Sequence, residues 1–195
     1  MLLEGNFYQR RDVSKIAREL LGKRLYSRVD GVVTGGIIVE TEAYSWKERG
    51  CHAYGARRTQ RTEVMFKEGG HAYIYLCYGM HHLFNIVTNV EGTAEAVLIR
   101  ALEPYQGVDT MVKRRGEAVR MKDLTSGPGK LTRAMGIDRS LNGIFLTNKE
   151  IWVENGERIT TKHIEASRRI GIDYAGKDAM LPWRFTIKGN AWISQ

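Results

Sequence analysis

A strand that carries charged residues constrains this chain more than any other feature. Residues 37–39 are Ile, Ile and Val, and this β-branched run predicts a strand that continues to Tyr44. Side chains alternate across a strand, so Glu40, Glu42 and Tyr44 share one face. A Glu-x-Glu face is commonly exposed to water. Here tyrosine-rich strands and a strand that carries Arg100 follow it, so we interpret the two carboxylates as part of a functional site.

Composition narrows the class of protein. The chain has 195 residues and is 43% apolar, enough for one sizeable core, which predicts a single domain over residues 1–195. We see no apolar run of membrane-spanning length and no signal peptide at the N-terminus. Two cysteines are too few for a disulfide scaffold and favour a reducing compartment, so we expect a cytoplasmic protein. The net charge of +8 favours a polyanionic partner.

Turn signals and apolar periodicity indicate an α+β fold. We predict one compact domain with a largely antiparallel, curved β-sheet, flanking helices and a protruding β-hairpin. The expected helices begin after Asp12 and end at Gly22, cover 108–115, and start again near Pro128. The expected strands include two joined pairs: 25–29 with 32–44 through Asp30-Gly31, and 71–77 with 83–88 through Tyr78-Gly79-Met80. Further strands are expected at 96–102, at 151–153 and 157–159 as a hairpin across Asn155-Gly156, and at 185–188.

Two basic segments are candidates for contacts with phosphates. The long polar loop between residues 45 and 61 contains Arg57 and Arg58. Gly127-Pro128-Gly129-Lys130 is similar to a nucleotide phosphate loop but lacks its first glycine and its magnesium-binding hydroxyl. Lys130 and free amides at a helix start can still bind a DNA phosphate, and an ordinary helix cap is an equally good explanation.

The sequence gives little support for a metal site or for a catalytic thiol. The histidines at 52, 71, 81 and 82 lack metal-ligand spacing. Cys51 is adjacent to His52, and adjacent side chains seldom face each other as a nucleophile and its base must. Glu40 and Glu42 could hold magnesium as a nuclease pair, yet no Asp-rich partner follows them. We expect no metal and no cofactor, and we keep the nuclease as a weaker alternative.

An ordered set of motifs resembles the alkyladenine (3-methyladenine) DNA glycosylase family. Each motif is weak alone, but the ordered set is specific and covers nearly the whole chain. The motifs are Val39-Glu40-Thr41-Glu42-Ala43-Tyr44, Cys51-His52, Tyr73-Ile74-Tyr75-Leu76-Cys77-Tyr78-Gly79-Met80, Asn85-Ile86, Leu98-Ile99-Arg100-Ala101-Leu102-Glu103-Pro104, Ser126-Gly127-Pro128 with Lys130, Arg169-Ile170-Gly171 and Ala175-Gly176.

The resemblance implies a role for each matching residue. Glu42 matches the general base, and Arg100 and the backbone carbonyl of Ile170 match groups that hold the attacking water. Tyr44, His52 and Tyr75 match the residues that sandwich a flipped base. Asn85 matches a pocket-floor residue that excludes guanine by crowding its 2-amino group, and Tyr78 matches the hairpin-tip side chain that fills the gap in the duplex.

The residue types suit that chemistry. Base excision requires the nucleotide to leave the stack, and a side chain wedged from the minor groove holds the duplex open. Aromatic faces attract a cationic base such as 3-methyladenine, although a strand tyrosine such as Tyr75 is more often a core residue. One carboxylate can activate water while it stabilises the oxocarbenium-like transition state. Arg100 can also simply pair with Glu42 or Glu40 and hold the strand.

We therefore expect a monofunctional, monomeric enzyme whose partner is double-stranded DNA containing damaged purines, with no membrane involvement. No lysine lies on the Glu42 face, so no Schiff-base lyase step is expected. The competing class is a catalytically inactive minor-groove DNA-binding module of the same fold. An RNA-binding translation or formyl-transfer module rests on basic charge alone and is the weakest alternative.

These expectations predict how activity responds to chelator and salt. Base release should persist in EDTA, and DNA binding should weaken steeply between low and high salt because Lys and Arg neutralise phosphates. Excision and binding assays across both titrations measure this. Loss of activity in EDTA with recovery on added magnesium would instead support the nuclease interpretation of Glu40 and Glu42.

Overall fold

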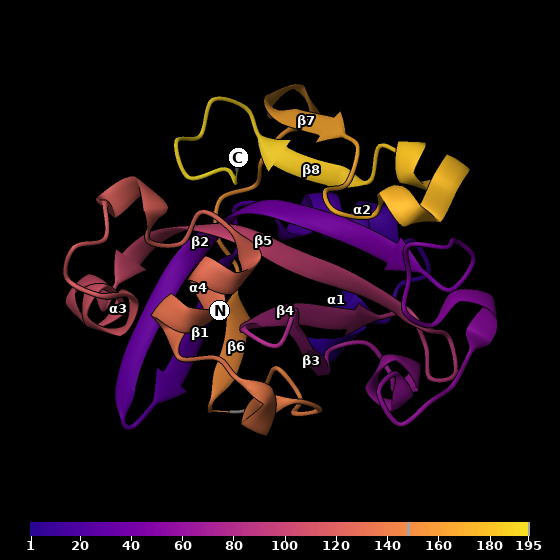
Figure 1. The fold of residues 1–195 in the computed structure, drawn as a ribbon, viewed down its shortest axis with the longest axis horizontal. Helices are drawn as coiled ribbons and strands as arrows, with labels where there is room; N and C mark the ends of the chain where they lie inside the picture. The colour runs from indigo at the N-terminus through magenta and orange to yellow at the C-terminus, as the bar shows by residue number, and fades with distance from the viewer. Residues whose placement is uncertain (148, 195) are drawn as a thin grey trace.

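The sheet is assembled around one long central strand. The computed structural model describes residues 1–147 and 149–194. The strands are β1 (Arg24–Val29), β2 (Val32–Ser45), β3 (Ala72–Cys77), β4 (His81–Thr88), β5 (Glu95–Gln106), β6 (Ile151–Glu154), β7 (Ile164–Ser167) and β8 (Arg184–Ile187). All pairings are antiparallel, in the order β3-β4-β5-β2-β1-β6, with β8 pairing both β2 and β7 (Figure 1). The predicted α+β class is confirmed.

Short helices flank this sheet. In Figure 1 α4 lies in front of β4 and β5, and α2 lies behind β2, in agreement with their contacts. The Asp12 side chain caps α2 as predicted, accepting the Lys15 N–H at 2.9 Å, and Gly22 follows the helix with a φ of 81°. The α-helices are α1 (Gly5–Tyr8), α2 (Val13–Leu20), α3 (Val108–Arg115) and α4 (Pro128–Met135). Short 3-10 helices cover Tyr54–Ala56, Glu63–Phe66, Met121–Asp123, Arg139–Leu141, Thr161–His163 and Asp173–Met180.

The charged part of β2 lies in the interior of the sheet, because strands pair with both of its edges. Along one edge β2 pairs with β5, and along the other β8 pairs with Glu40, Thr41 and Glu42. The register of β2 against β5 shifts on both sides of Glu40, which marks a β-bulge. Thr41 turns the other way and donates its hydroxyl to the Ala17 carbonyl of α2 at 2.9 Å. The predicted alternation of side chains is therefore confirmed.

The predicted hairpin of β3 and β4 is present, and its tip is exposed. Cys77 pairs with His81, so β4 begins two residues before the expected start at Leu83. Tyr78 has a φ of 50° at the tip, and its side chain is 87% exposed. The hairpin also exposes Leu76 and Met80, and exposed apolar side chains gathered in one place are typical of interaction sites.

The expected hairpin across Asn155-Gly156 is wrong. β6 pairs with β1, and the residues that follow it do not form its partner strand. The N-terminus takes that place, since the Leu3 N–H donates to the Val153 carbonyl at 2.8 Å. Gly156 instead packs against the backbone after α2, where a Cβ would lie 2.0 Å from the Gly22 carbonyl oxygen. Position 156 therefore requires glycine because two segments that are distant in the sequence approach each other closely there.

Candidate active site

Glu42 is fully buried, and three donors hold its carboxylate. Its Oε1 atom accepts the backbone N–H of Ile170 at 2.8 Å, and its Oε2 atom accepts the Tyr44 hydroxyl at 2.7 Å. Arg100 Nη1 lies 3.3 Å from Oε2. An ionised carboxylate has about four acceptor positions. These contacts therefore fix the orientation of Glu42 and still let Oε1 accept one more hydrogen bond.

Tyr44 acts as a donor to this carboxylate. Burial, and after it the charge of Glu42, raise the pKa of Tyr44 well above its ordinary value. The hydroxyl consequently keeps its proton at neutral pH, and its hydrogen bond to Glu42 fixes the position of the Tyr44 ring.

Glu40 organises a second buried cluster beside Glu42. Its Oε1 atom accepts from Arg100 Nε at 3.0 Å and from Arg184 Nε at 2.7 Å. Ser194, close to the C-terminus, donates its backbone N–H to Oε2 at 2.7 Å and its hydroxyl to Oε1 at 2.8 Å. Burial works against the charge of Arg100, yet Glu42 and Glu40 raise its pKa above the ordinary value. Arg100 is thus a permanent cation whose position Glu40 fixes.

A third buried ion pair supports the other side of the site. Arg169, whose side chain is fully buried, pairs with both carboxylate oxygens of Glu48, at 2.7 and 2.8 Å. The same guanidinium donates to the Ala43 carbonyl at 3.0 Å and lies 4.7 Å from the centre of the Tyr44 ring. Arg169 directly precedes Ile170, so its contacts hold the backbone amide that reaches Glu42.

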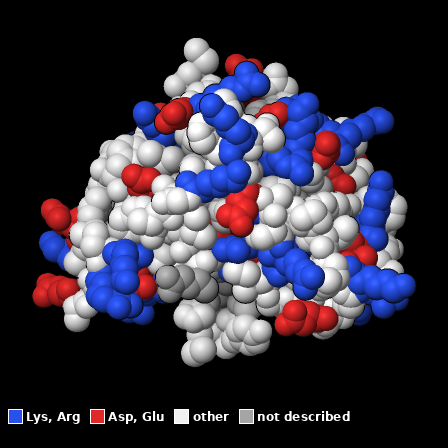
Figure 2. All heavy atoms as spheres, turned by 90° about the horizontal axis from the view of Figure 1, so that it is seen from above, with Lys and Arg blue, Asp and Glu red and all other residues white. Residues whose placement is uncertain are grey.

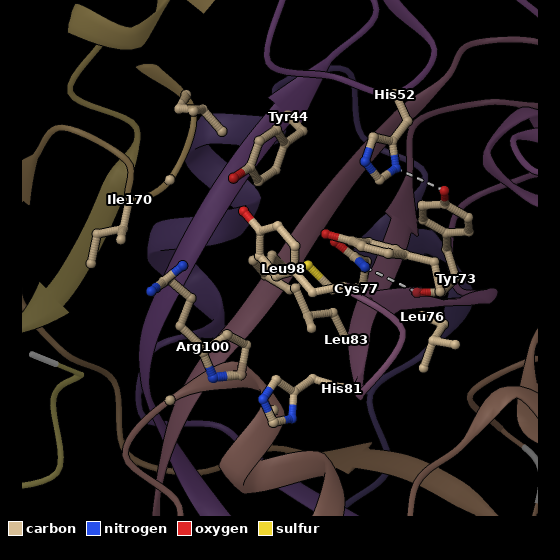
Figure 3. A pocket seen from close by; sticks show the side chains of 18 of the residues that line it. Tyr44, His52, Tyr73, Leu76, Cys77, His81, Leu83, Leu98, Arg100 and Ile170 are labelled. Carbon is tan, nitrogen blue, oxygen red and sulfur yellow. Dashed lines mark hydrogen bonds between the residues drawn. The ribbon is translucent and has the colours of Figure 1, made fainter. Parts of the chain in front are cut away.

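Aromatic side chains form the wall of a cleft of about 790 Å³. The His52 ring meets the Tyr75 ring edge-on, with centroids 4.6 Å apart, and His52 Nδ1 lies 2.9 Å from the Tyr73 hydroxyl. Asn85 donates its amide to the Tyr73 carbonyl at 3.0 Å, which fixes its side chain. Figure 3 shows His52 and Tyr73 on the side of the cleft opposite Ile170, with Arg100 and Tyr44 nearer to Ile170. Aromatic rings therefore form the walls of the cleft, and the buried carboxylate of Glu42 lies behind the wall that contains Tyr44.

Comparisons with known proteins decide the family. The family model for methylpurine-DNA glycosylase (MPG) matches residues 6–191. This chain belongs to that family. A Clostridium acetobutylicum protein named "Putative 3-methyladenine DNA glycosylase" is 44% identical over 202 residues, covering 100% of this chain and 98% of that protein. A Carboxydothermus hydrogenoformans protein of the same name is 47% identical over 196 residues, covering 100% of both. The resemblance seen in the sequence is confirmed.

The residues matched to the methylpurine-DNA glycosylase motifs gather at one place. Glu42 lies behind the cleft surface and contacts three of the residues that line it. Ile170 contributes its backbone N–H to Glu42, whereas the resemblance concerned its carbonyl. The residues to which the resemblance gives a role in water activation, base stacking, the pocket floor or intercalation, and which line the cleft, are Tyr44, His52, Tyr75, Tyr78, Asn85, Arg100 and Ile170.

The three candidate phosphate contacts are placed differently. Lys130 lines the cleft near the start of α4, and its Nζ pairs with Asp123 at 3.0 Å. Arg58 makes two hydrogen bonds to Glu63, at 2.9 and 2.6 Å, and Arg57 is exposed on the same loop. Figure 2 shows Lys and Arg side chains spread across the face seen there, interspersed with Asp and Glu. These lysine and arginine contacts with DNA remain a prediction.

Several neighbours of the candidate site were not found from the sequence. Ser194, Arg184 and Glu48 carry no local motif, and each reaches the site through contacts distant in the chain. Arg169 could have been found, because it belongs to the same matched motif as Ile170. Among residues 1–147 and 149–194, no group of three or more His, Cys, Asp or Glu side chains could hold a metal ion, and no helix is long and apolar enough to cross a membrane.

The environment of His52 predicts a pH-dependent stability. Burial, and then the charge of Arg61, lower its pKa from 6.5 to about 4. The unfolded chain therefore binds a proton below pH 6.5, whereas the folded protein takes it up only near pH 4. As the pH drops from 6.5 to 4, the free energy of unfolding falls by up to about 3 kcal/mol. NMR titration of the His52 imidazole, assigned with His52→Gln, measures the pKa, and urea unfolding of both proteins measures the slope. A midpoint near the ordinary histidine value would contradict the burial of this ring.

Proposed function

We propose that this chain is a monofunctional DNA glycosylase that removes alkylated purines, among them 3-methyladenine and 7-methylguanine, and also hypoxanthine. It acts as one monomeric domain over residues 1–195 in the bacterial cytosol, where its free cysteines stay reduced. The damaged nucleotide rotates out of double-stranded DNA into the cleft, and water hydrolyses the N-glycosidic bond. Family membership and the names of the relatives support the substrate class.

The observation that carries this proposal is the geometry of Glu42. Its carboxylate is buried beside an aromatic cleft, fixed by Ile170 and Tyr44, and keeps acceptor capacity on Oε1. A water molecule bound to Oε1 is deprotonated as it attacks C1′, while the negative charge of Glu42 stabilises the oxocarbenium-like transition state. Arg100 and the Ile170 carbonyl orient that water.

The flipped base is held by the aromatic walls. Tyr44 and Tyr75 stack on it together with His52, and Asn85 at the pocket floor excludes the 2-amino group of guanine. Tyr78, exposed at the hairpin tip, enters the minor groove and fills the gap in the duplex. Lys130, Arg57 and Arg58 contact phosphates of the DNA. Lys130 leaves Asp123, and Arg58 leaves Glu63, to make these contacts.

The buried charges favour an enzyme over an inactive DNA-binding module of the same fold. A binding module requires the exposed Tyr78 and basic surface residues but has no use for a fully buried Glu42. Removing a charge from water costs several kcal/mol unless excellent partners compensate it. A chain that needed only DNA binding would do as well with apolar residues at these positions.

Substituting Glu42 tests the proposed base. In Glu42→Gln we expect lesion-containing duplex DNA to bind as in the wild type, while the single-turnover rate of base release falls by about 10²- to 10⁴-fold, because only the water-activating group is lost. Glu165→Gln, an exposed residue on β7, is the matched control and should retain the wild-type rate. Undiminished release by Glu42→Gln would exclude Glu42 as the base. Tight binding without release by the wild type on any damaged duplex would favour the binding module.

Substituting Tyr78 tests the proposed intercalation. Tyr78→Ser should melt at the wild-type temperature because the side chain is 87% exposed. Excision from a fully paired duplex should fall strongly, since support worth about 1–3 kcal/mol is lost, and excision from a bulged lesion should fall less. Tyr54→Ser, an exposed aromatic outside the hairpin, is the control. Equal losses on both substrates would place Tyr78 in the pocket, and a much lower melting temperature would make it a core residue.

A further inference from the structure

Arg61 places a positive charge against the base pocket. Its guanidinium carbon lies 5.2 Å from the centre of the Tyr75 ring, and its Nη2 lies 3.4 Å from His52 Nε2. Arg61 also lines the cleft. It comes from the exposed loop before Glu63–Phe66, whereas the aromatic rings that it contacts form the wall where the flipped base is proposed to stack.

The charge of Arg61 differs from that of the buried arginines because no carboxylate balances it. Arg100 and Arg184 each pair with Glu40, and Arg169 pairs with Glu48. Within the described parts of the chain, no ion pair joins Arg61 to an acidic side chain. The electrostatic effect reaches the pocket wall, because Arg61 adds to burial in lowering the pKa of His52. Arg61 is therefore an uncompensated cation at the mouth of the pocket.

Burial, and then the charge of Arg61, lower the pKa of His52 and keep it neutral, and the contact with Arg61 favours one tautomer. When Arg61 donates to Nε2, the remaining imidazole proton lies on Nδ1 and is donated to the Tyr73 hydroxyl oxygen. His52 then contributes no charge of its own, and Arg61 is a cation in direct contact with this wall of the pocket.

Excision moves charge onto the base, and the amount that results depends on the lesion. When the C1′–N9 bond breaks, its electron pair stays on the base nitrogen, and the water oxygen forms the new bond to C1′ while Glu42 takes the water proton. A cationic base such as 7-methylguanine thereby leaves neutral. A neutral base such as hypoxanthine leaves as an anion, which afterwards takes a proton from solvent, and Glu42 returns its own proton to solvent.

We propose that Arg61 is a specificity-determining residue that favours excision of neutral purine lesions over cationic ones. Its guanidinium stabilises the negative charge that develops on a neutral base as it leaves. It also repels a base that enters as a cation. Arg61 donates hydrogen bonds only and transfers no proton, because its guanidinium does not titrate in a protein. This inference rests on the proposed glycosylase function and deepens it by assigning the lesion class.

The test compares two lesions in one duplex sequence. We would measure single-turnover release of hypoxanthine and of 7-methylguanine at saturating enzyme for the wild type, Arg61→Gln, Arg61→Lys and Arg57→Gln. Unit charges about 5 Å apart in a partly solvated site are worth on the order of a tenfold change in rate. We expect Arg61→Gln to release hypoxanthine about tenfold more slowly and 7-methylguanine no more slowly than the wild type. Arg61→Lys should keep the wild-type ratio of the two rates, because it keeps the charge.

The control variant and the opposed outcomes separate charge from structure. Arg57→Gln removes the same charge from the same loop and should change both rates by one factor, as a lost phosphate contact would. The deciding quantity is the rate of hypoxanthine release divided by the rate of 7-methylguanine release. If this ratio in Arg61→Gln stays within about twofold of the wild-type ratio, or rises above it, the inference is overturned while the proposed function stays intact. Wild-type protein that releases 7-methylguanine but no hypoxanthine would also contradict it. Release of neither base would overturn the proposed function itself.

Discussion

The cluster of Glu40, Glu42 and Arg100 is the interaction on which the rest of the site depends. Both carboxylates are fully buried, and the arginine that joins them is 7% exposed. Breaking a buried charge pair by removing one partner typically costs about 3–5 kcal/mol, because the remaining charge stays in a low-dielectric interior. The fold must therefore deliver each cation and donor to its position. Pairing of β2 with β5 on one edge and β8 on the other brings these groups together.

The same electrostatic requirement ties distant segments to the cleft. Arg184 from β8 and Ser194 near the C-terminus both bind Glu40, so the end of the chain fixes the side chain that orients Arg100. Arg169 and Glu48 do the same for the Ile170 amide and the Tyr44 ring. A site held this way needs little rearrangement when charge develops in the transition state, which is how fixed dipoles and charges accelerate a reaction. In our account, burying these charges costs free energy, and the contacts among them give a rigid site.

Local sequence patterns predicted most of the longer elements, missed the short α1 and β7, and gave only part of the environment of each element. The alternation of Glu40 and Glu42 with Thr41, the Asp12 cap and the exposed Tyr78 follow from rules that act within a few residues, and the structure confirms all three. The hairpin across Asn155-Gly156 failed because the N-terminus lies beside β6, and nothing local distinguishes that partner from a second strand.

The candidate site shows the same division. Glu42 and Arg100 could be identified because ordered motifs resemble a known family, whereas the contacts of Ser194 and Arg184 with Glu40 span more than 140 residues and leave no pattern. The charge of Arg61 could be read from the sequence, yet the absence of a balancing carboxylate is a property of the folded surface. Proximity in space decides the electrostatics of this pocket, and the chain order does not reveal it.

A crystal structure of the Glu42→Gln variant bound to duplex DNA that contains hypoxanthine would test the central claim most directly. Our account predicts a purine rotated out of the helix between Tyr44 and Tyr75. Its C1′ should face the substituted side chain across a single water that Arg100 also contacts, with Tyr78 in the vacated stack. A lesion still paired in the duplex, or a base in the cleft whose C1′ faces away from residue 42, would contradict the account.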